Sequence, residues 1–263
     1  MKEQQLEIVF NRQINSNTWL MGLNAPEMAK SARPGQFVMI RVSRSMHPLL
    51  RRPFSICGTK DTLMLILYRV VGQGTAIMAH ASHGQKFSVL GPLGRGFTFP
   101  DAEGSIVLVG GGIGVAPLFF LAQNLKKHRF LFMAGFGSAD EIIPVGEVIG
   151  TQIDVSIATD DGSIGHKGPV TELLEKYIAG RDINKKAISL FTCGPKPMLK
   201  RIADMSKDQR FWCEVSLEAS MACGVGACQG CAVKAASGKD KAYYHVCKDG
   251  PVFAITSIDW ASY

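Results

Sequence analysis

The chain has 263 residues, 46% of them hydrophobic, and a formal net charge of +7 at pH 7. It is long enough for more than one buried core. No apolar run reaches the roughly 18 residues of a membrane-spanning helix. Residues 1–14 lack the apolar core of a signal peptide. We therefore expect no membrane segment and no export, and the clustered cysteines described below favour a reducing, cytoplasmic compartment. Lys and Arg are spread along the chain, so we expect solvated charges and no nucleic-acid partner.

The amino-terminal section consists of short apolar or alternating runs between glycine and proline turns. Such runs occupy residues 37–42, 63–71 and 86–90. Runs of this length and spacing are typical of strands in a small antiparallel barrel or sandwich. We therefore expect an all-β section that ends near residue 100.

Two polar strings in this section suit a flavin dinucleotide. A guanidinium pairs with a pyrophosphate, a hydroxyl bonds the isoalloxazine edge, and closely spaced backbone amides bind phosphate. Either string alone is also found at ordinary strand ends, so the prediction rests on the two together. The residues predicted to bind the flavin are Arg52, Pro53, Phe54, Ser55, Leu67, Tyr68, Arg69, Gly74 and Thr75.

The pattern changes near residues 100–105. Apolar runs at 106–109, 130–134, 155–158 and 188–192 now alternate with helical segments, and a last strand is expected at 213–217. Strands that alternate with helices predict a doubly wound, parallel α/β sheet.

A glycine run follows the first of these strands and precedes a helix expected at 118–127. A strand, a glycine turn and a helix start together bring a pyrophosphate onto free backbone amides. Pro117 stands where the usual dinucleotide fingerprint has its third glycine, so this is a variant of that site. The residues predicted to bind a nicotinamide nucleotide here are Gly110, Gly111, Gly112 and Gly114.

Two later groups of residues follow the carboxyl ends of strands, at the same edge of the sheet. Asp160 and Asp161 follow the strand at 155–158, where carboxylates bond ribose hydroxyls or form a solvated turn. Cys193 follows the strand at 188–192; it is either a packed thiol or a catalytic residue near the nicotinamide ring.

Four of the seven cysteines crowd into a glycine-rich segment near the carboxyl terminus. Cys223, Cys228 and Cys231 have the spacing C-x4-C-x2-C, and Cys247 follows after fifteen more residues. This spacing is typical of a plant-type [2Fe-2S] cluster, with Gly224, Gly226 and Gly230 permitting a tight loop. A structural zinc site is the alternative, although zinc ligands usually form two close pairs. Cys57, Cys193 and Cys213 are expected to be buried.

The order of these motifs carries a family resemblance. Arg52 to Ser55, the glycine run at 110–114 and Cys193 to Pro195 together resemble the ferredoxin reductase family. The strings SLEASMACGVGAC at 216–228 and VCKDGPVF at 246–253 are similar to the electron transfer subunits of dihydroorotate dehydrogenase B. That second resemblance covers essentially the whole chain.

The resemblance implies three domains and three cofactors. It implies an FAD-binding β barrel at 1–100, a pyridine-nucleotide-binding α/β domain at 101–215 and a small [2Fe-2S] domain at 216–263. It also implies a separate catalytic subunit that contains FMN and oxidises dihydroorotate in pyrimidine synthesis, in a heterotetramer of two copies of each. Electrons would pass from that FMN through the cluster and FAD to NAD.

Two alternatives stay open. The flavin subunits of NADH-dependent ferredoxin:NADP oxidoreductases and of sulfide dehydrogenases share this architecture, but there an aspartate replaces the first cluster ligand, which is Cys223 here. The other alternative, from a different class, is a non-catalytic module that holds zinc or senses redox state.

Overall fold

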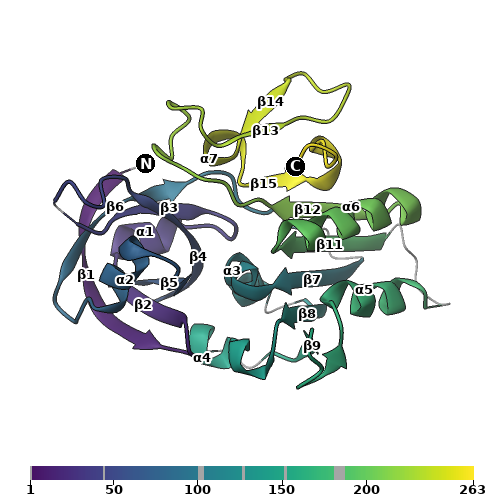
Figure 1. Cartoon of the computed structure of the whole chain (residues 1–263), viewed down its shortest axis with the longest axis horizontal. Helices are drawn as coiled ribbons and strands as arrows, with labels where there is room; N and C mark the ends of the chain where they lie inside the picture. Colours follow the sequence, from purple (N-terminus) through teal and green to yellow (C-terminus); the bar gives the residue numbers. More distant parts are fainter. Residues whose placement is uncertain (1, 44, 100–103, 126–127, 151–152, 181–186) are drawn as a thin grey trace.

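The computed structural model describes residues 2–43, 45–99, 104–125, 128–150, 153–180 and 187–263. A barrel lies at one end of the molecule and an α/β sheet at the other, and the carboxyl-terminal segment lies across both (Figure 1). The domain boundary expected at residue 101 falls outside the described residues.

Six antiparallel strands close the barrel, in the order β1-β2-β5-β4-β3-β6. Alternate side chains point inward, so Leu6 and Ile8 are buried on either side of the partly exposed Glu7. The predicted strands at 37, 63 and 86 begin at those residues. The elements are β1 (Lys2–Gln13), β2 (Thr18–Asn24), α1 (Pro26–Ser31), β3 (Phe37–Arg41), β4 (Arg52–Lys60), β5 (Leu63–Arg69), α2 (Gln73–Ala79) and β6 (Lys86–Leu93).

The second sheet has the strand order β10-β9-β8-β7-β11-β12-β15, and all of its pairs are parallel except the last. β7 is therefore the point where the strand order reverses. The elements before the carboxyl-terminal segment are β7 (Ser105–Gly111), η1 (Gly112–Gly114), α3 (Val115–Asn124), β8 (Phe130–Phe136), η2 (Ala139–Glu141), α4 (Val145–Ile149), β9 (Val155–Thr159), β10 (His166–Lys167), α5 (Val170–Ile178), β11 (Ile188–Cys193), α6 (Lys196–Gln209) and β12 (Trp212–Ser216).

Helix α3 joins the two halves of the molecule. It lies between the sheet and barrel strand β4, so residues 115–122 are all buried, as expected for a helix covered on every side (Figure 1). At its carboxyl end Gln123 forms two hydrogen bonds with the Thr59 main chain, at 2.7 and 3.1 Å. A second link connects Thr98 with the Glu214 carboxylate, which accepts from the Thr98 amide at 2.8 Å and hydroxyl at 2.7 Å.

The carboxyl-terminal segment leaves the sheet from β12 and returns to it. It contains β13 (Ala232–Lys234), β14 (Tyr243–His245), α7 (Val246–Asp249), β15 (Val252–Ala254) and η4 (Ile255–Ser257). β15 pairs antiparallel with β12 and adds the seventh strand. The segment that we expected as an appendage thus shares the sheet of the nucleotide section, and the expected boundary at 215/216 falls inside β12.

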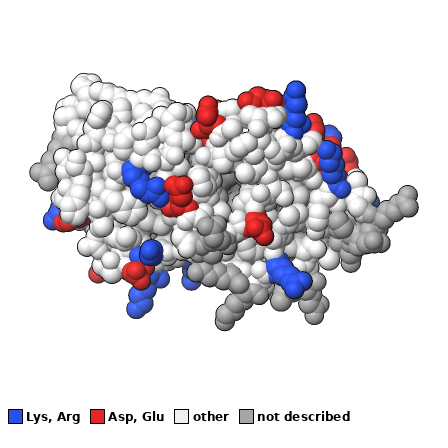
Figure 2. Space-filling model, turned by 90° about the horizontal axis from the view of Figure 1, so that it is seen from below, with Lys and Arg blue, Asp and Glu red and all other residues white. Residues whose placement is uncertain are grey.

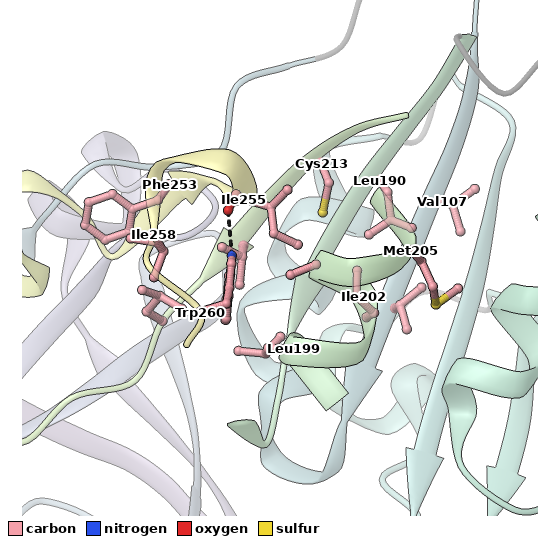
Figure 3. Packing of buried hydrophobic residues seen from close by; sticks show 14 of the residues in the cluster. Val107, Leu190, Leu199, Ile202, Met205, Cys213, Phe253, Ile255, Ile258 and Trp260 are labelled. Carbon is pink, nitrogen blue, oxygen red and sulfur yellow. Dashed lines mark hydrogen bonds between the residues drawn. The ribbon is translucent and has the colours of Figure 1, made fainter. Parts of the chain in front are cut away.

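This segment also shares a core with the sheet. Ile255, Ile258 and Trp260 pack against Leu199 and Ile202 of α6 (Figure 3). The Trp260 indole Nε1 donates a hydrogen bond of 2.7 Å to the main-chain oxygen of Ile255, which holds the ring in this core.

Charged side chains of both signs are interspersed on the face shown in Figure 2. Several form exposed ion pairs, such as Lys2 with Glu27 at 2.8 Å. Within the described residues, none of the helices has the length and apolar character needed to cross a membrane.

Candidate flavin, nucleotide and cluster sites

A cavity of about 480 Å³ lies where the three parts of the molecule meet. Its walls come from β4 and β5 of the barrel, from Ile113 and Ala116 beside the glycine run, and from residues 216–221 before the cysteine loop. We refer to it as the junction cavity. The predicted flavin residues that line it are Arg52, Pro53, Phe54, Ser55, Leu67, Tyr68, Arg69 and Thr75.

Gly74, the remaining predicted flavin residue, packs beside this wall. A Cβ at Gly74 would lie 2.7 Å from Arg52 Nε, so a larger residue there would displace the guanidinium. The neighbouring Thr75 hydroxyl accepts hydrogen bonds from the amides of Val71 at 2.9 Å and Gly72 at 3.1 Å. The turn that follows β5 is thereby held against Arg52.

Arg69 provides a test of whether the cavity fits an anionic cofactor. Its Nη2 lies 3.3 Å from the Glu141 carboxylate, but its buried Nε has no hydrogen-bond partner among the described residues. A buried N–H without a partner is costly, and an oxygen-rich ligand in the cavity would satisfy it. The polar groups of the junction cavity therefore fit FAD.

A second hollow of about 540 Å³ lies at the carboxyl ends of β7 and β8, where the strand order reverses. Open α/β sheets bind ligands at this position. Gly111, Gly112 and Asp160 line it, and Arg69 borders both hollows. We refer to it as the switch-point crevice.

The other predicted nucleotide residues lie behind or beside this crevice. A Cβ at Gly114 would come 2.5 Å from the main-chain oxygen of Cys193, so only glycine permits this approach. Gly110 packs in the same way against Val115. Asp161 is not among the lining residues; it accepts hydrogen bonds from the Ser163 hydroxyl at 2.6 Å and amide at 2.9 Å, which lower the pKa of its carboxyl.

Cys193 is 2% exposed and lines neither hollow, although its backbone adjoins the glycine run. Burial raises the pKa of its thiol well above the ordinary range, and the Glu218 carboxylate adds to this effect. The described geometry thus agrees with packing, and a role beside the nicotinamide ring stays a prediction.

The four cysteines near the carboxyl terminus form two pairs. Cys231 and Cys247 have their Sγ atoms 3.3 Å apart, and the Cys228 amide donates a hydrogen bond of 3.4 Å to Cys223 Sγ. As the side chains stand, no three or more His, Cys, Asp or Glu residues in the described ranges form a site for a single metal ion. Two pairs of thiols are the donor set of a [2Fe-2S] cluster, in which two irons share four cysteines.

Backbone amides point at the sulfurs of both pairs. Cys223 Sγ accepts from the amides of Val225 and Cys228, both at 3.4 Å, and Cys247 Sγ accepts from the Gly226 amide at 3.1 Å. Burial opposes ionisation of Cys223, but the hydrogen bonds from Cys228 and Val225 outweigh it and lower its pKa to about 6. Such donors stabilise thiolate ligands.

The loop needs left-handed backbone conformations to aim these amides. Gly224 and Gly226 have φ of +74° and +82°, as expected for glycines in a tight turn. Before the third ligand it is Gln229, at φ +59°, and not Gly230 that adopts this conformation.

The two pairs differ in burial. Cys231 and Cys247 are 2% and 3% exposed, whereas Cys223 is half-buried and Cys228 exposed. Burial, followed by the neighbouring Cys231 thiol, raises the pKa of Cys247 to about 12. The loop thus has an inner pair inside the protein and an outer pair at the surface.

Sequence reasoning missed the end of β12 and the residues that lead from it to the first ligand. Ser216, Glu218 and Met221 line the junction cavity, and Pro251 joins them from the return of the chain. Glu218 follows the carboxyl end of a parallel strand, the same signal that identified Asp160.

Known proteins resemble the chain in sequence over nearly its whole length. Residues 218–259 match the iron-sulfur cluster binding domain of dihydroorotate dehydrogenase B. The electron transfer subunit of dihydroorotate dehydrogenase B (NAD(+)) from Desulforamulus reducens is 40% identical, with 93% of each chain covered. The corresponding subunit from Caldanaerobacter subterraneus subsp. tengcongensis is 37% identical, with 95% of this chain and 96% of the relative covered.

Solved structures agree with the architecture. An NADH-dependent reduced ferredoxin-NADP oxidoreductase superposes with a TM-score of 0.84 at 29% identity, covering 98% of this chain and 91% of that one. A ferredoxin NADP+ reductase from Neisseria gonorrhoeae, with bound FAD and NADP, superposes with a TM-score of 0.65 at 16% identity, covering 82% of this chain and 100% of that one. The second likeness shows the ferredoxin reductase-like fold alone.

The barrel, the parallel sheet, the paired cysteines and this extent of identity agree with one another. The chain belongs to the family of electron transfer subunits of dihydroorotate dehydrogenase B.

Proposed function

We propose that this chain carries FAD in the junction cavity, NAD(H) in the switch-point crevice and a [2Fe-2S] cluster on Cys223, Cys228, Cys231 and Cys247. It passes electrons between a dihydroorotate-oxidising partner and NAD in pyrimidine synthesis. A bound flavin would exchange hydride with a nicotinamide and single electrons with a cluster. The amino-acid side chains of this chain do not supply this redox chemistry.

The observation that carries the proposal is the common wall of the junction cavity. The barrel contributes Arg52 and Ser55, the glycine-run region contributes Ile113, and the segment leading to the cysteines contributes Met221. The segments that carry the three expected cofactor sites therefore each contribute to the wall of one cavity. A ligand there would lie between the nucleotide and the cluster.

In this mechanism the residues of this chain bind the cofactors and orient them. Arg52 and Arg69 present guanidinium groups to the cavity, suited to a pyrophosphate or to flavin oxygens. Gly111 and Gly112 bring backbone close to the nucleotide. The amides of Val225, Gly226 and Cys228 hold thiolate sulfurs in place.

We place dihydroorotate oxidation in a second polypeptide. The described part of the chain has one barrel and one parallel sheet, and the junction cavity and the switch-point crevice are assigned to FAD and NAD. The partner is an FMN-containing catalytic subunit, and two copies of each form a heterotetramer in the cytoplasm, where reduced thiols persist.

The exposed outer pair of cysteines indicates where this partner docks. Of four lysines near the loop, Lys234 is bound to Asp259 at 3.0 Å and Lys241 to Asp249 at 2.7 Å. Lys239 and Lys248 have no ion-pair partner among the described residues and are the cations left to orient an acidic face.

Reconstitution tests the proposal. The purified holoprotein is expected to reduce artificial dyes with NADH but to act on dihydroorotate only after an FMN-containing subunit is added. Dihydroorotate oxidation by this chain alone, or none by the pair once flavin and cluster are confirmed by absorbance, would defeat the assignment.

A second candidate rests on the likeness to the NADH-dependent reduced ferredoxin-NADP oxidoreductase. Under it, the same holoprotein would exchange electrons with ferredoxin and would not support dihydroorotate oxidation with any partner. Parallel assays with reduced ferredoxin and with the FMN-containing subunit separate the two.

A further inference from the structure

The proposed relay joins carriers that differ in their protons. An iron-sulfur cluster carries single electrons without protons, whereas NAD accepts a hydride, which is two electrons and one proton. The flavin between them must therefore gain one proton for every two electrons that arrive from the cluster, and lose one in the reverse direction. A titratable group of this chain that borders both solvent and the junction cavity could carry that proton.

Glu218 is the one carboxyl side chain that lines the junction cavity within the described residues. It lies between the end of β12 and the first cluster ligand, Cys223. Its side chain is accessible to solvent through the cavity, although the surrounding protein is dense enough that burial raises its pKa. Solvent and the cavity therefore meet at this carboxyl group.

The surroundings of Glu218 hold its backbone and leave its carboxyl free. The Tyr263 hydroxyl donates to the main-chain oxygen of Glu218 at 3.3 Å, and Lys196 Nζ lies 4.6 Å above the Tyr263 ring. No hydrogen bond to the carboxylate is made by any described residue. A carboxyl group with free lone pairs is able to take up and release a proton.

Three charged or titratable groups face this carboxyl from other elements. Arg69 of β5 opposes the effect of burial and favours the carboxylate. Cys193 of β11 and Tyr263 each have a pKa that the Glu218 charge raises, after the larger effect of burial. Both are therefore neutral near physiological pH, so the carboxyl group is the member of this cluster that titrates most readily.

We propose that Glu218 exchanges a proton between solvent and the flavin in the junction cavity; this rests on the proposed function. Towards NAD, two electrons arrive from the cluster and one proton moves from Glu218 to the flavin. Both electrons and that proton then leave as hydride, and Glu218 is reprotonated from solvent. Towards the cluster, hydride arrives from NADH, two electrons leave singly, and the Glu218 carboxylate accepts the proton and releases it to solvent.

The test separates hydride transfer from proton release. The holoprotein is first reduced anaerobically with NADH, and the bleaching of the flavin is timed. It is then mixed with excess ferricyanide, a one-electron acceptor, in weak buffer with a pH-indicator dye. Flavin recovery and proton release are followed together, in H₂O and D₂O.

Glu218→Gln is expected to keep its FAD and bleach with NADH at the parent rate, because hydride transfer needs no separate proton. Proton release and flavin recovery are expected to slow by roughly 10²-fold, the lower end of the contribution of a positioned acid-base group. The remaining rate should lose its dependence on pH. Glu218→Asp, which keeps the acid, should recover most of the rate.

The matched control is Glu7→Gln, which makes the same charge change on the outside of the barrel. It should match the parent in every phase. Parent-like proton release in Glu218→Gln overturns the inference. Loss of FAD from both Glu218 variants overturns it too, since Glu218 would then be a counter-charge for Arg69. If the parent itself shows no flavin or cluster reduction by NADH, the proposed function fails instead.

Discussion

The cysteine loop and the junction cavity are built in opposite ways. Three of the four thiols lie within residues 223–231, and the Cys223 sulfur accepts hydrogen bonds from two amides of the same stretch. The cavity instead takes its walls from β4, β5, the glycine-run region and residues 216–221. Binding of the cluster in a local site depends on every one of its ligands. A site distributed over several elements loses only part of its affinity for the cofactor when one side chain is changed.

Removal of one thiol should give the largest effect. Cys231→Ser is expected to abolish the [2Fe-2S] cluster and to retain FAD, because Cys231 is a ligand of the inner pair and lies outside the junction cavity. Iron content, flavin absorbance and the paramagnetic signal of the reduced protein measure this. Cys213→Ser, a buried thiol of β12 away from the loop, is the control. A full signal in Cys231→Ser would remove Cys231 from the ligand set.

Loss of one cavity side chain should weaken FAD without abolishing it. Arg52→Ala forfeits a charge-assisted hydrogen bond of roughly 1.5–3 kcal/mol, so the Kd for FAD should rise by about 10- to 150-fold. Titration of the apoprotein with FAD, followed by flavin fluorescence, measures the change. Arg33→Ala, on the exposed turn before β3, should bind as the parent does. Equal affinity in Arg52→Ala would place the pyrophosphate elsewhere.

A backbone substitution sharpens the comparison within the loop. Gly224→Ala adds a Cβ at φ +74° and 2.5 Å from Met39 Cγ, so it combines strain with a clash against the barrel. Gly238→Ala has a similar φ, +79°, and meets nothing within 4 Å. Each should lose about 1 kcal/mol to backbone strain, and Gly224→Ala more. Thermal unfolding and iron content should rank Gly224→Ala below Gly238→Ala; the reverse order would contradict the packing of this loop on β3.

The smallest effect concerns the choice of nucleotide. Asp160 lines the switch-point crevice and should disfavour the 2′-phosphate of NADPH, so the parent is expected to prefer NADH. Asp160→Asn should lower this preference by about fivefold, corresponding to about 1 kcal/mol of like-charge repulsion in water. Asp161→Asn should leave it unchanged, because that carboxylate is bound to Ser163. Equal rates of flavin reduction by both nucleotides in the parent would contradict the prediction.

The sequence predicted what is encoded locally. The strands that begin at 37, 63 and 86 were predicted from alternation, and the cysteine spacing singled out four thiols that the fold brings together as two pairs. Eight of the nine predicted flavin residues line one cavity. Seven of them follow each other along the paired strands β4 and β5, and Thr75 lies in α2, directly after β5.

Long-range pairing was not predictable in the same way. β15 has three residues, too few to show a period of two, and its place in the sheet is decided by the partner strand β12. The role of Glu218 in the cavity wall was missed for a related reason, since that wall exists only after the barrel and the sheet have packed together. The roles of Cys193 and of the individual nucleotide residues remain predictions.

The pairing of β12 with β15 has a mechanical consequence for the cysteine loop. The chain leaves the sheet at Ser216 and rejoins it at Val252, which is the partner of Ser216 in the register of the two strands. The loop is therefore a lariat closed by backbone hydrogen bonds, and no flexible tether sets the distance between the thiols and the junction cavity. Opening of the lariat should accordingly cost part of the sheet.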